Sequence, residues 1–351
     1  MADNKKRIIE SLVFILLVAV CWVFLQAVFS YNWDTEHVSA KYESYVNAED
    51  GSIDVLWIGT SNTYSDICPV VIWHNSGITS FNMGTANNVS LFEYYQLKYL
   101  IKHNKPKIVA IDFSGASVEE SPDKYAQFEP TYRKMAETMP DLGIRLSMIR
   151  DFCKKYESLD MPSFLLPLLR YHARWEELKA EDWDVFSGND SYSEYRKGAY
   201  FSTNVEPKEF APDLFTRKTE AVPLYAEYYQ MIYDLCHDEG IDVFVTLLPN
   251  VRQRYADYEM AKEFAETNKL NIAAFTTVQS MQIIGLDAGK HFYDNEHLNI
   301  IGQNIFSAYI GEYIAKIYGL TDHRGDEAYS DWDMWYDEYF EKYDKRKEEV
   351  H

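Results

Sequence analysis

The longest apolar segment of the 351-residue chain lies close to its start. Residues 8–29 are interrupted only by Glu10, Ser11 and Gln26. At ~1.5 Å per residue, a helix of this length spans the ~30 Å hydrocarbon core of a bilayer. The pattern therefore predicts one transmembrane helix at residues 8–30.

The charges before this segment predict its orientation. Lys5, Lys6 and Arg7 precede the apolar run, and positive residues beside a membrane helix tend to stay in the cytoplasm. Residues 1–7 would then be cytoplasmic, and the chain after about Tyr31 would lie on the outer face of the cell membrane.

A cleavable signal peptide is the alternative to this anchor. Val28 and Ser30 form a permissible small-residue cleavage site. The apolar run, however, is longer than the ~7–15 residues of a signal-peptide core. We favour the uncleaved anchor, and in both cases the bulk of the chain is exported.

Residues 31–51 are polar and show no clear period, and we interpret them as a stalk. After them, short apolar runs alternate with segments of helical periodicity. The runs predict strands at Ile53–Ile58, Ile78–Met83, Lys107–Phe113 and Ile241–Leu248. The periodic segments predict helices at residues 90–104, 223–237, 258–269 and 300–318, with a Ser90–Glu93 capping box and Asn299 as an N-cap. This alternation indicates an α/β domain whose parallel sheet is covered on both faces.

The domain predicted at residues 52–320 is interrupted by a segment with a different pattern. Residues 122–222 are rich in aromatic and charged side chains, and we interpret them as a largely helical insertion packed over the sheet edge and lining the site. Within it, His172, Arg174 and Trp175 suit either a site for a sugar or an anionic acyl carrier, or a half-buried helix, which we favour. Residues 321–351 form an acidic, aromatic tail, interpreted as a solvated helix or a segment laid along the domain.

Charge and cysteine spacing exclude several classes of partner. The chain has 34 Lys and Arg against 55 Asp and Glu, a net charge of −21, which disfavours nucleic acid. Since the N-terminus is basic, the acid belongs to the exported part, where it favours a neutral or cationic substrate over a polyanion. The cysteines have no metal-ligand spacing, so we predict neither a metal nor a cofactor.

Two short motifs could carry chemistry at the carboxyl edge of the sheet, where such folds bind their ligands. Gly59, Thr60 and Ser61 follow the first predicted strand, and Asp294 and His297 precede the last predicted helix. A carboxylate three residues from a histidine can orient the ring, and the ring can then accept a proton from a serine. The combination predicts a Ser61–His297–Asp294 triad.

These motifs resemble those of the SGNH (GDSL-like) hydrolase family. Gly59-Thr60-Ser61 matches its GDS block with Thr60 in the usual Asp place, and Asp294 to His297 match its DxxH block. The resemblance implies a three-layer, flavodoxin-like α/β/α fold and an oxyanion hole that includes the N–H groups of Ser61 and Gly84.

The third block of the family, GxND, has no counterpart here. Its expected place reads Asp112-Phe113-Ser114-Gly115. The third oxyanion donor therefore stays open between Asn87, Asn88 and Ser114, and we take Asn87 as the first candidate.

The single anchor before such a domain resembles the DltD protein of teichoic-acid D-alanylation and accessory proteins of membrane-bound O-acyltransferases. That resemblance implies an esterase or O-acyltransferase acting on cell-envelope polysaccharide, with an acylated glycan or acyl donor as substrate and a membrane-bound O-acyltransferase as partner. The alternative is a non-catalytic binding or scaffold protein. The missing GxND asparagine and the Thr60 replacement favour this alternative, whereas retention of all three triad positions opposes it.

Overall fold

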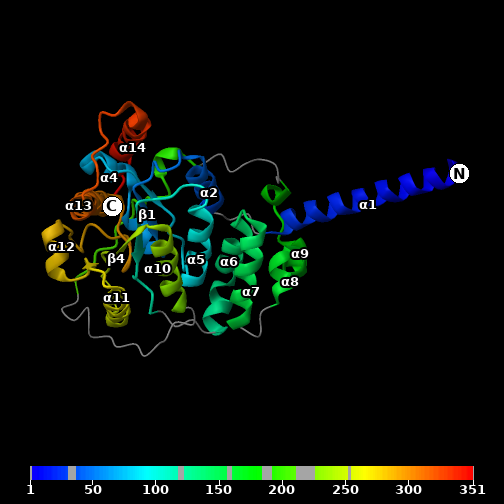
Figure 1. The fold of residues 1–351 in the computed structure, drawn as a ribbon, viewed down its shortest axis with the longest axis horizontal. Helices are drawn as coiled ribbons and strands as arrows, with labels where there is room; N and C mark the ends of the chain where they lie inside the picture. Colours follow the sequence, from blue (N-terminus) through cyan, green and yellow to red (C-terminus); the bar gives the residue numbers. More distant parts are fainter. Residues whose placement is uncertain are drawn as a thin grey trace. The chain divides into compact units, whose positions relative to one another are not determined.

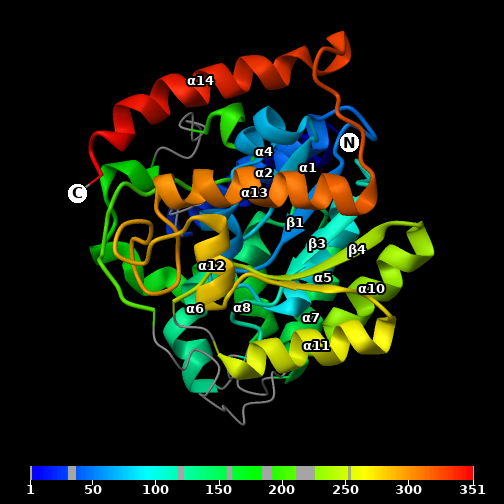
Figure 2. The ribbon, with the colours of Figure 1, turned by 90° about the vertical axis from the view of Figure 1, so that its left-hand side faces the viewer.

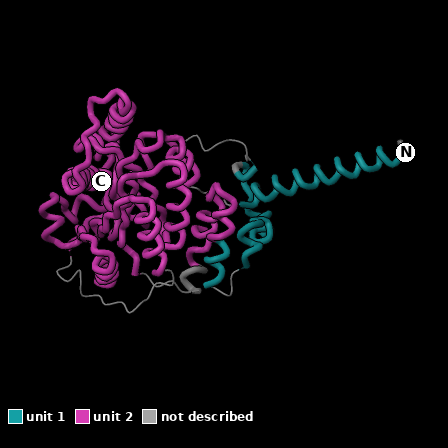
Figure 3. The backbone as a smooth tube through the Cα atoms, viewed as in Figure 1, with its two compact units in different colours: residues 1–35, 149–191 teal, residues 36–148, 192–351 magenta. Residues whose placement is uncertain are grey.

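The computed structural model describes residues 2–30, 37–117, 122–155, 160–183, 192–210, 226–251 and 254–350. The chain forms two compact units, distinguished by colour in Figure 3. One comprises residues 1–35 and 149–191, and the other comprises residues 36–148 and 192–351.

The larger unit is built on a five-stranded parallel sheet with the order β2-β1-β3-β4-β5. Its strands are β1 (Val55–Ile58), β2 (Ser80–Asn82), β3 (Ile108–Asp112), β4 (Asp242–Leu247) and β5 (Ile272–Ala274). This is the flavodoxin-like strand order, in which successive strands are added first on one side of β1 and then, from β3 on, on the other side. The predicted α/β class with a parallel sheet is confirmed.

Helices cover both faces of the sheet (Figures 1 and 2). On one face α4 (Pro69–Ser76), α12 (Val278–Ile284) and α13 (Ile300–Tyr318) enclose a core with Trp57 and Phe244. On the other lie α5 (Ser90–Leu100), α10 (Glu227–Glu239) and α11 (Tyr255–Asn268). Burial on both faces explains why the strands are continuous apolar runs.

The predicted caps have different outcomes. Asn299 caps α13, and its side-chain oxygen accepts from the N–H groups of Ile301 and Gly302 at 3.1 Å. The capping box expected at Ser90 and Glu93 is wrong, because α5 has Val89 at its N-cap position and no side-chain cap. Glu93 is instead fully buried.

The segment interpreted as a stalk contains a helix. Residues 31–36 lie outside the described residues, but Val38–Asn47 form α2, with Lys41, Tyr42 and Tyr45 buried. The sequence pattern did not indicate this helix because its burial depends on contacts with distant segments. Lys41 Nζ, for example, donates to the Gly84 carbonyl at 2.8 Å.

The segment interpreted as an insertion is largely helical where it is described. It contains α6 (Pro122–Thr138), α7 (Leu142–Lys155), α8 (Met161–Leu165), α9 (Pro167–Tyr171), and the 3-10 helices η1 (His172–Glu176), η2 (Ala180–Trp183) and η3 (Glu194–Arg196).

The acidic tail is also helical. It comprises η4 (Glu327–Tyr329) and α14 (Ser330–Lys347). Figure 2 shows α14 outside α4 and α13, where Trp332 and Tyr339 are buried. The tail is therefore laid along the domain by its aromatic side chains, one of the two interpretations offered for it.

The smaller unit contains the apolar helix α1 (Ala2–Phe29). Within the described ranges it is the one helix long and apolar enough, over Asn4–Phe29, to cross a membrane. Its end is fixed by Arg174, which donates to the carbonyls of Phe29 and Ser30 at 2.9 Å and pairs with Asp182 at 2.6 Å. The contacts of Arg174 are thus structural.

Candidate active site

Ser61 follows the first strand at a tight turn. Gly59 has a φ of +154°, and a Cβ on it would lie 2.2 Å from Thr63 Oγ1, so only glycine fits. Ser61 begins α3 (Ser61–Asp66), with Thr60 at the N-cap position. The Thr60 hydroxyl donates to the Ser114 carbonyl at 3.1 Å, which ties this turn to the loop after β3.

The second motif folds on itself around one carboxylate. Asp294 Oδ1 accepts from the N–H groups of Glu296 at 2.7 Å and His297 at 2.9 Å. Its other oxygen, Oδ2, lies 2.7 Å from His297 Nδ1. Tyr293 stacks on the imidazole, with ring centroids 5.2 Å apart and planes inclined by 10°. The ring orientation is thus fixed from its edge and its face.

The structure brings the three predicted triad residues together. His297 Nε2 lies 2.7 Å from Ser61 Oγ, on the side of the ring opposite the Asp294 contact. The His297 side chain is 13% exposed and that of Asp294 is 37% exposed. Carboxylate, imidazole and hydroxyl therefore form a continuous hydrogen-bonded series in which a proton can pass from oxygen to nitrogen.

The Asp294 carboxylate is stabilised in its charged form. Partial burial raises its pKa, but the hydrogen bond and charge of His297 and the N–H groups of Glu296 and His297 outweigh that effect. The net pKa lies below its ordinary value. Asp294 therefore remains an acceptor for the ring N–H down to acidic pH.

Further hydrogen bonds join the two motifs. The Asn62 side chain donates to the Glu296 carbonyl, and the Leu298 N–H donates to Asp66 Oδ1 at 2.9 Å. Asn62 and Asp66 belong to the helix that Ser61 begins, and Glu296 and Leu298 flank His297. These contacts hold the serine and the imidazole in register although they lie 236 positions apart.

Ser61 opens onto a cavity of about 240 Å³. Its polar lining includes Ser61, Asn62, Asn87, Asn88, Ser90, Arg254 and Glu296. Its apolar lining includes Val89, Ala116, Phe128, Tyr132 and Tyr229. Phe128 and Tyr132 belong to α6, so the segment interpreted as an insertion contributes to the lining. The cavity can hold a small group beside the serine hydroxyl.

Gly84 occupies a different role from the expected oxyanion donor. Its N–H donates to Asn82 Oδ1 at 3.0 Å, so that donor is already bonded. A Cβ on Gly84 would lie 2.7 Å from the Tyr64 nitrogen and 2.9 Å from the Thr60 carbonyl oxygen. The residue therefore lets the β2 loop pack closely against the start of α3, which carries Ser61.

The other donor candidates are separated by their contacts. Ser114 is buried, its N–H donates to Asp112 and its hydroxyl accepts from Leu248. The Asn88 side-chain NH2 donates to the Gly59 carbonyl at 3.5 Å, and its side-chain oxygen accepts from the Val89 N–H at 3.0 Å. Asn87 lines the cavity, and its amide, like the Ser61 N–H, makes no hydrogen bond with any described residue. Ser61 and Asn87 are thus the donors with free capacity beside the hydroxyl.

A buried carboxyl group lies behind the serine turn. Asp112 ends β3 and accepts from the Ser114 N–H at 2.9 Å and from Thr63 Oγ1 at 3.2 Å. Burial raises its pKa to about 7, against the opposing effect of these donors. At neutral pH the group is therefore balanced between its two protonation states.

Sequence reasoning missed several residues of this site. Asn62 and Arg254 stand in no recognisable motif, and Asp112 was noticed only as part of an unmatched block. The position of Asn62 directly after the serine was the one available signal. Among the described residues, no group of three or more His, Cys, Asp or Glu side chains is placed to hold a metal ion.

Comparison with known proteins does not show to which family the chain belongs. No family profile and no curated protein matches the sequence. One similar solved structure is a protein of Bacteroides fragilis NCTC 9343 provisionally named an acylhydrolase. It aligns over 82% of this chain and 99% of its own length, with 11% identity and a TM-score of 0.37. Function must therefore be inferred from the site itself.

Proposed function

We propose that this protein is a serine acyl-ester enzyme, anchored in the membrane, that hydrolyses or transfers an acyl group. One observation carries the proposal. His297 lies 2.7 Å from both Ser61 Oγ and Asp294 Oδ2, and Ser61 lines a cavity. This arrangement matches the requirement for an activated serine, in which a base contacts the nucleophile and a third group orients the base.

In the first half of the reaction, Ser61 Oγ attacks the ester carbonyl while His297 Nε2 takes the hydroxyl proton. Asp294 holds the Nδ1–H and stabilises the imidazolium that forms. The Ser61 N–H and the Asn87 amide donate to the oxyanion. The ester C–O bond then breaks and His297 gives its proton to the leaving alcohol oxygen, so that an acyl ester of Ser61 and a neutral imidazole remain. Removal of one oxyanion donor usually lowers kcat about 10²–10³-fold, and the proposal assigns an effect of this size to Asn87.

In the second half, the acyl group leaves Ser61 for an acceptor oxygen. His297 takes the acceptor proton, and the serine oxygen recovers a proton as the acyl bond breaks. Water as acceptor gives an esterase, and a sugar hydroxyl gives an O-acyltransferase. Phe128 and Tyr132 support the second outcome, because an apolar lining excludes water from the intermediate.

The cavity volume limits the acyl group. Its 240 Å³ lies below the ~300–1,000 Å³ of pockets that enclose drug-sized ligands. A short acyl group suits it better than a fatty acid. With the apolar helix α1 and the basic residues Lys5, Lys6 and Arg7 in its first turns, we place the site outside the cytoplasmic membrane, where cell-envelope polysaccharide is the acceptor and a membrane-bound O-acyltransferase the partner.

The test is carried out on the full chain in detergent micelles. A fluorescent phosphonate reports the nucleophile, and 4-nitrophenyl acetate reports turnover. We expect labelling and turnover in the native protein and in Ser147→Ala, a helix serine of α7 outside the cavity lining. Ser61→Ala should lose both.

Equal labelling of native protein and Ser61→Ala would contradict the proposal. Labelling without turnover of the acetate would favour transfer over hydrolysis. If neither occurs, while polysaccharide acylation in cells survives Ser61→Ala and His297→Ala, the scaffold alternative gains support.

Orientation is tested separately. A C-terminal epitope should be removed by protease added to intact spheroplasts, whereas an N-terminal epitope should be protected. Protection of the C-terminal epitope would place the site in the cytoplasm and contradict the extracytoplasmic location.

A further inference from the structure

Among the described residues that line the cavity containing Ser61, one is a cation. Arg254 is partly exposed and lies in the same lining as Ser61, Asn87 and Ser90. Its guanidinium makes no hydrogen bond and no ion pair with any described residue. Five N–H donors are therefore left to water or to a ligand.

Several other arginines of this chain contact a carboxylate. Arg133 contacts Glu129 at 2.6 Å, and Arg174 contacts Asp182 at 2.6 Å. Arg324 is held by Asp322 at 2.5 Å even on the surface. In a chain with 55 acidic residues, an arginine without a carboxylate partner inside a cavity calls for a ligand-based explanation.

The position of Arg254 adds to the positive potential of the cavity. It is the N-cap residue of α11, and the N-terminus of a helix carries partial positive charge that disfavours a cation. Asp257, in the first turn of α11, forms no ion pair with the Arg254 guanidinium and so does not neutralise its charge by direct contact. Its carboxylate accepts instead from the N–H groups of Gly115 at 2.9 Å and Ser117 at 2.7 Å.

Two negative contributions oppose this potential. The net charge of −21 is spread over the protein, and surface charges beyond the ~8 Å screening length contribute little inside the cavity. Glu296 also lines the cavity, but no ion pair joins it to Arg254. No described carboxylate therefore forms an ion pair with the Arg254 guanidinium.

We propose that Arg254 is a specificity-determining residue that binds an anionic group, carboxylate or phosphate, of the ester substrate. The planar guanidinium matches both groups, with two parallel N–H donors. The proposal rests on the proposed function and deepens it. It also changes the expectation drawn from net charge, because a neutral or cationic substrate would leave Arg254 without a partner.

The main test compares two esters of similar size with the same leaving group. The full chain in detergent hydrolyses 4-nitrophenyl acetate, which is neutral, and mono-4-nitrophenyl succinate, which carries a carboxylate on the acyl side. The ratio of their kcat/KM values, anionic over neutral, is the readout. Arg254→Gln should lower this ratio about 10- to 100-fold, the usual effect of losing a charge-assisted hydrogen bond.

Two further variants make this result specific. Arg254→Lys keeps the charge but loses the planar fork, so it should retain part of the preference. Arg346→Gln removes an arginine of α14 outside the cavity lining and should leave the ratio unchanged. A ratio in Arg254→Gln within about threefold of the native value would overturn the proposal.

Calorimetry separates this proposal from the proposed function and distinguishes the two anions. Succinate and inorganic phosphate are titrated into the native chain and into Arg254→Gln. Binding of either anion that is weakened at least about tenfold by the substitution supports the proposal, and the stronger one identifies the group. Absence of binding, or equal binding to both proteins, contradicts it even if neither ester is turned over.

Discussion

The protein contains an aspartate–histidine pair at each end of its sheet. At the carboxyl end, His297 Nδ1 lies 2.7 Å from Asp294. At the amino end, His323 Nε2 lies 3.3 Å from Asp54, which directly precedes β1. The two histidine side chains are almost equally exposed, at 13% and 12%. Residue type and the burial of the histidine therefore do not separate a candidate catalytic pair from a structural one.

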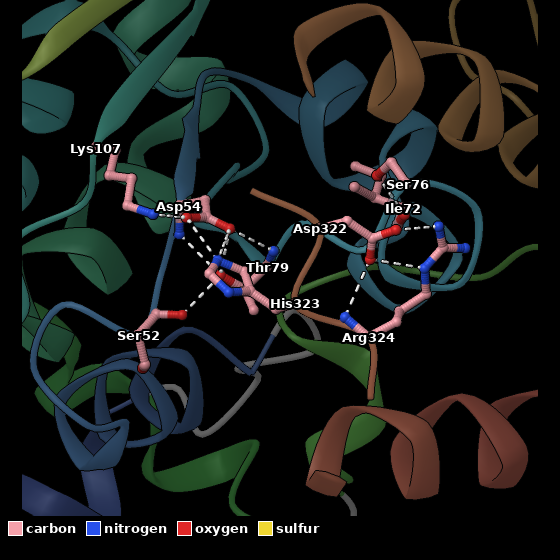
Figure 4. A network of polar contacts seen from close by, with 9 residues as sticks. All are labelled: Ser52, Asp54, Ile72, Ser76, Thr79, Lys107, Asp322, His323 and Arg324. Carbon is pink, nitrogen blue, oxygen red and sulfur yellow. Dashed lines mark hydrogen bonds and ion pairs between the residues drawn. The ribbon is translucent and has the colours of Figure 1, made fainter. Parts of the chain in front are cut away.

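The surroundings of the amino-end pair are structural (Figure 4). Asp54 contacts Lys107 Nζ at 2.7 Å and accepts from the Thr79 N–H at 2.9 Å. The His323 ring stacks on Tyr329, with centroids 4.2 Å apart. This network fixes the segment before α14 beneath the sheet.

The carboxyl-end pair differs in the contact made by the second ring nitrogen of its histidine. His297 Nε2 faces the Ser61 hydroxyl, and Ser61 lines a cavity. A histidine–carboxylate pair becomes a candidate for catalysis when a reactive hydroxyl and space for a substrate lie beyond it. The same pair sandwiched between a cation and an aromatic ring stabilises the fold.

The largest expected difference between the two ends is catalytic. Ser61→Ala and His297→Ala should each lower kcat for an acetate ester by about 10⁴–10⁶-fold, because either change removes the activated nucleophile. His323→Ala should change kcat less than about threefold while lowering the melting temperature. A large loss of kcat in His323→Ala with the fold intact would contradict the structural role assigned to the amino-end pair.

The sequence predicted the parts of this site that depend on local interactions. Asp294 bonds only to residues within three positions of itself, so its motif is visible in a short window. Asn299 caps its helix in the same local manner. The apolar runs similarly revealed four strands, because burial on both faces requires them.

The missed parts depend on distant contacts. The strand Ile272–Ala274 is only three residues long and adds to the sheet through β4. Lys41 is buried because it meets the Gly84 carbonyl, 43 positions away. Arg254 becomes a candidate for ligand binding only because the fold places it in the same cavity lining as Ser61. No local pattern records such placements.

The aspartates of the two pairs should separate activity from stability. Asp294→Asn should lower kcat about 10²–10⁴-fold, since an amide no longer fixes the ring tautomer or stabilises the imidazolium. Asp54→Asn should cost about 1–3 kcal/mol of unfolding free energy, because Lys107 and His323 lose their carboxylate. Ester kinetics and urea unfolding in micelles, applied to both variants, measure the two effects. Equal losses of kcat would contradict the assignment of roles.

The buried aspartate that ends β3 should make the stability of the protein depend on pH. Asp54 has cationic partners, whereas Asp112 accepts only from N–H and O–H groups and burial raises its pKa to about 7. A raised pKa means that its stabilising contribution is complete below the ordinary value of 3.8 and is lost as pH rises through 7.

Asp112→Asn keeps the neutral shape and removes this titration. The stability of the variant relative to the native protein should therefore increase by about 2–3 kcal/mol between about pH 5 and about pH 8. Asp66, whose pKa burial also raises, is present in both proteins and largely cancels in the difference. Urea titrations across this range measure the effect, and a constant difference would mean that Asp112 stays ionised.

The smallest expected effects come from two glycines, one at each end of the sheet. In Gly84→Ala the new Cβ would lie 2.7 Å from the Tyr64 nitrogen, so the start of α3 must shift and displace Ser61 from His297. A displacement of this kind should lower kcat about 10- to 100-fold.

In Gly77→Ala, the Cβ would lie 1.7 Å from Asp322 Oδ1 and the residue has a φ of +71°, so strain falls on the segment before α14. That variant should lose stability and retain kcat within about threefold, because no residue of the proposed triad moves. If Gly77→Ala lowered kcat as much as Gly84→Ala in a folded protein, the two ends of the sheet would be coupled and the division between a catalytic and a structural pair would fail.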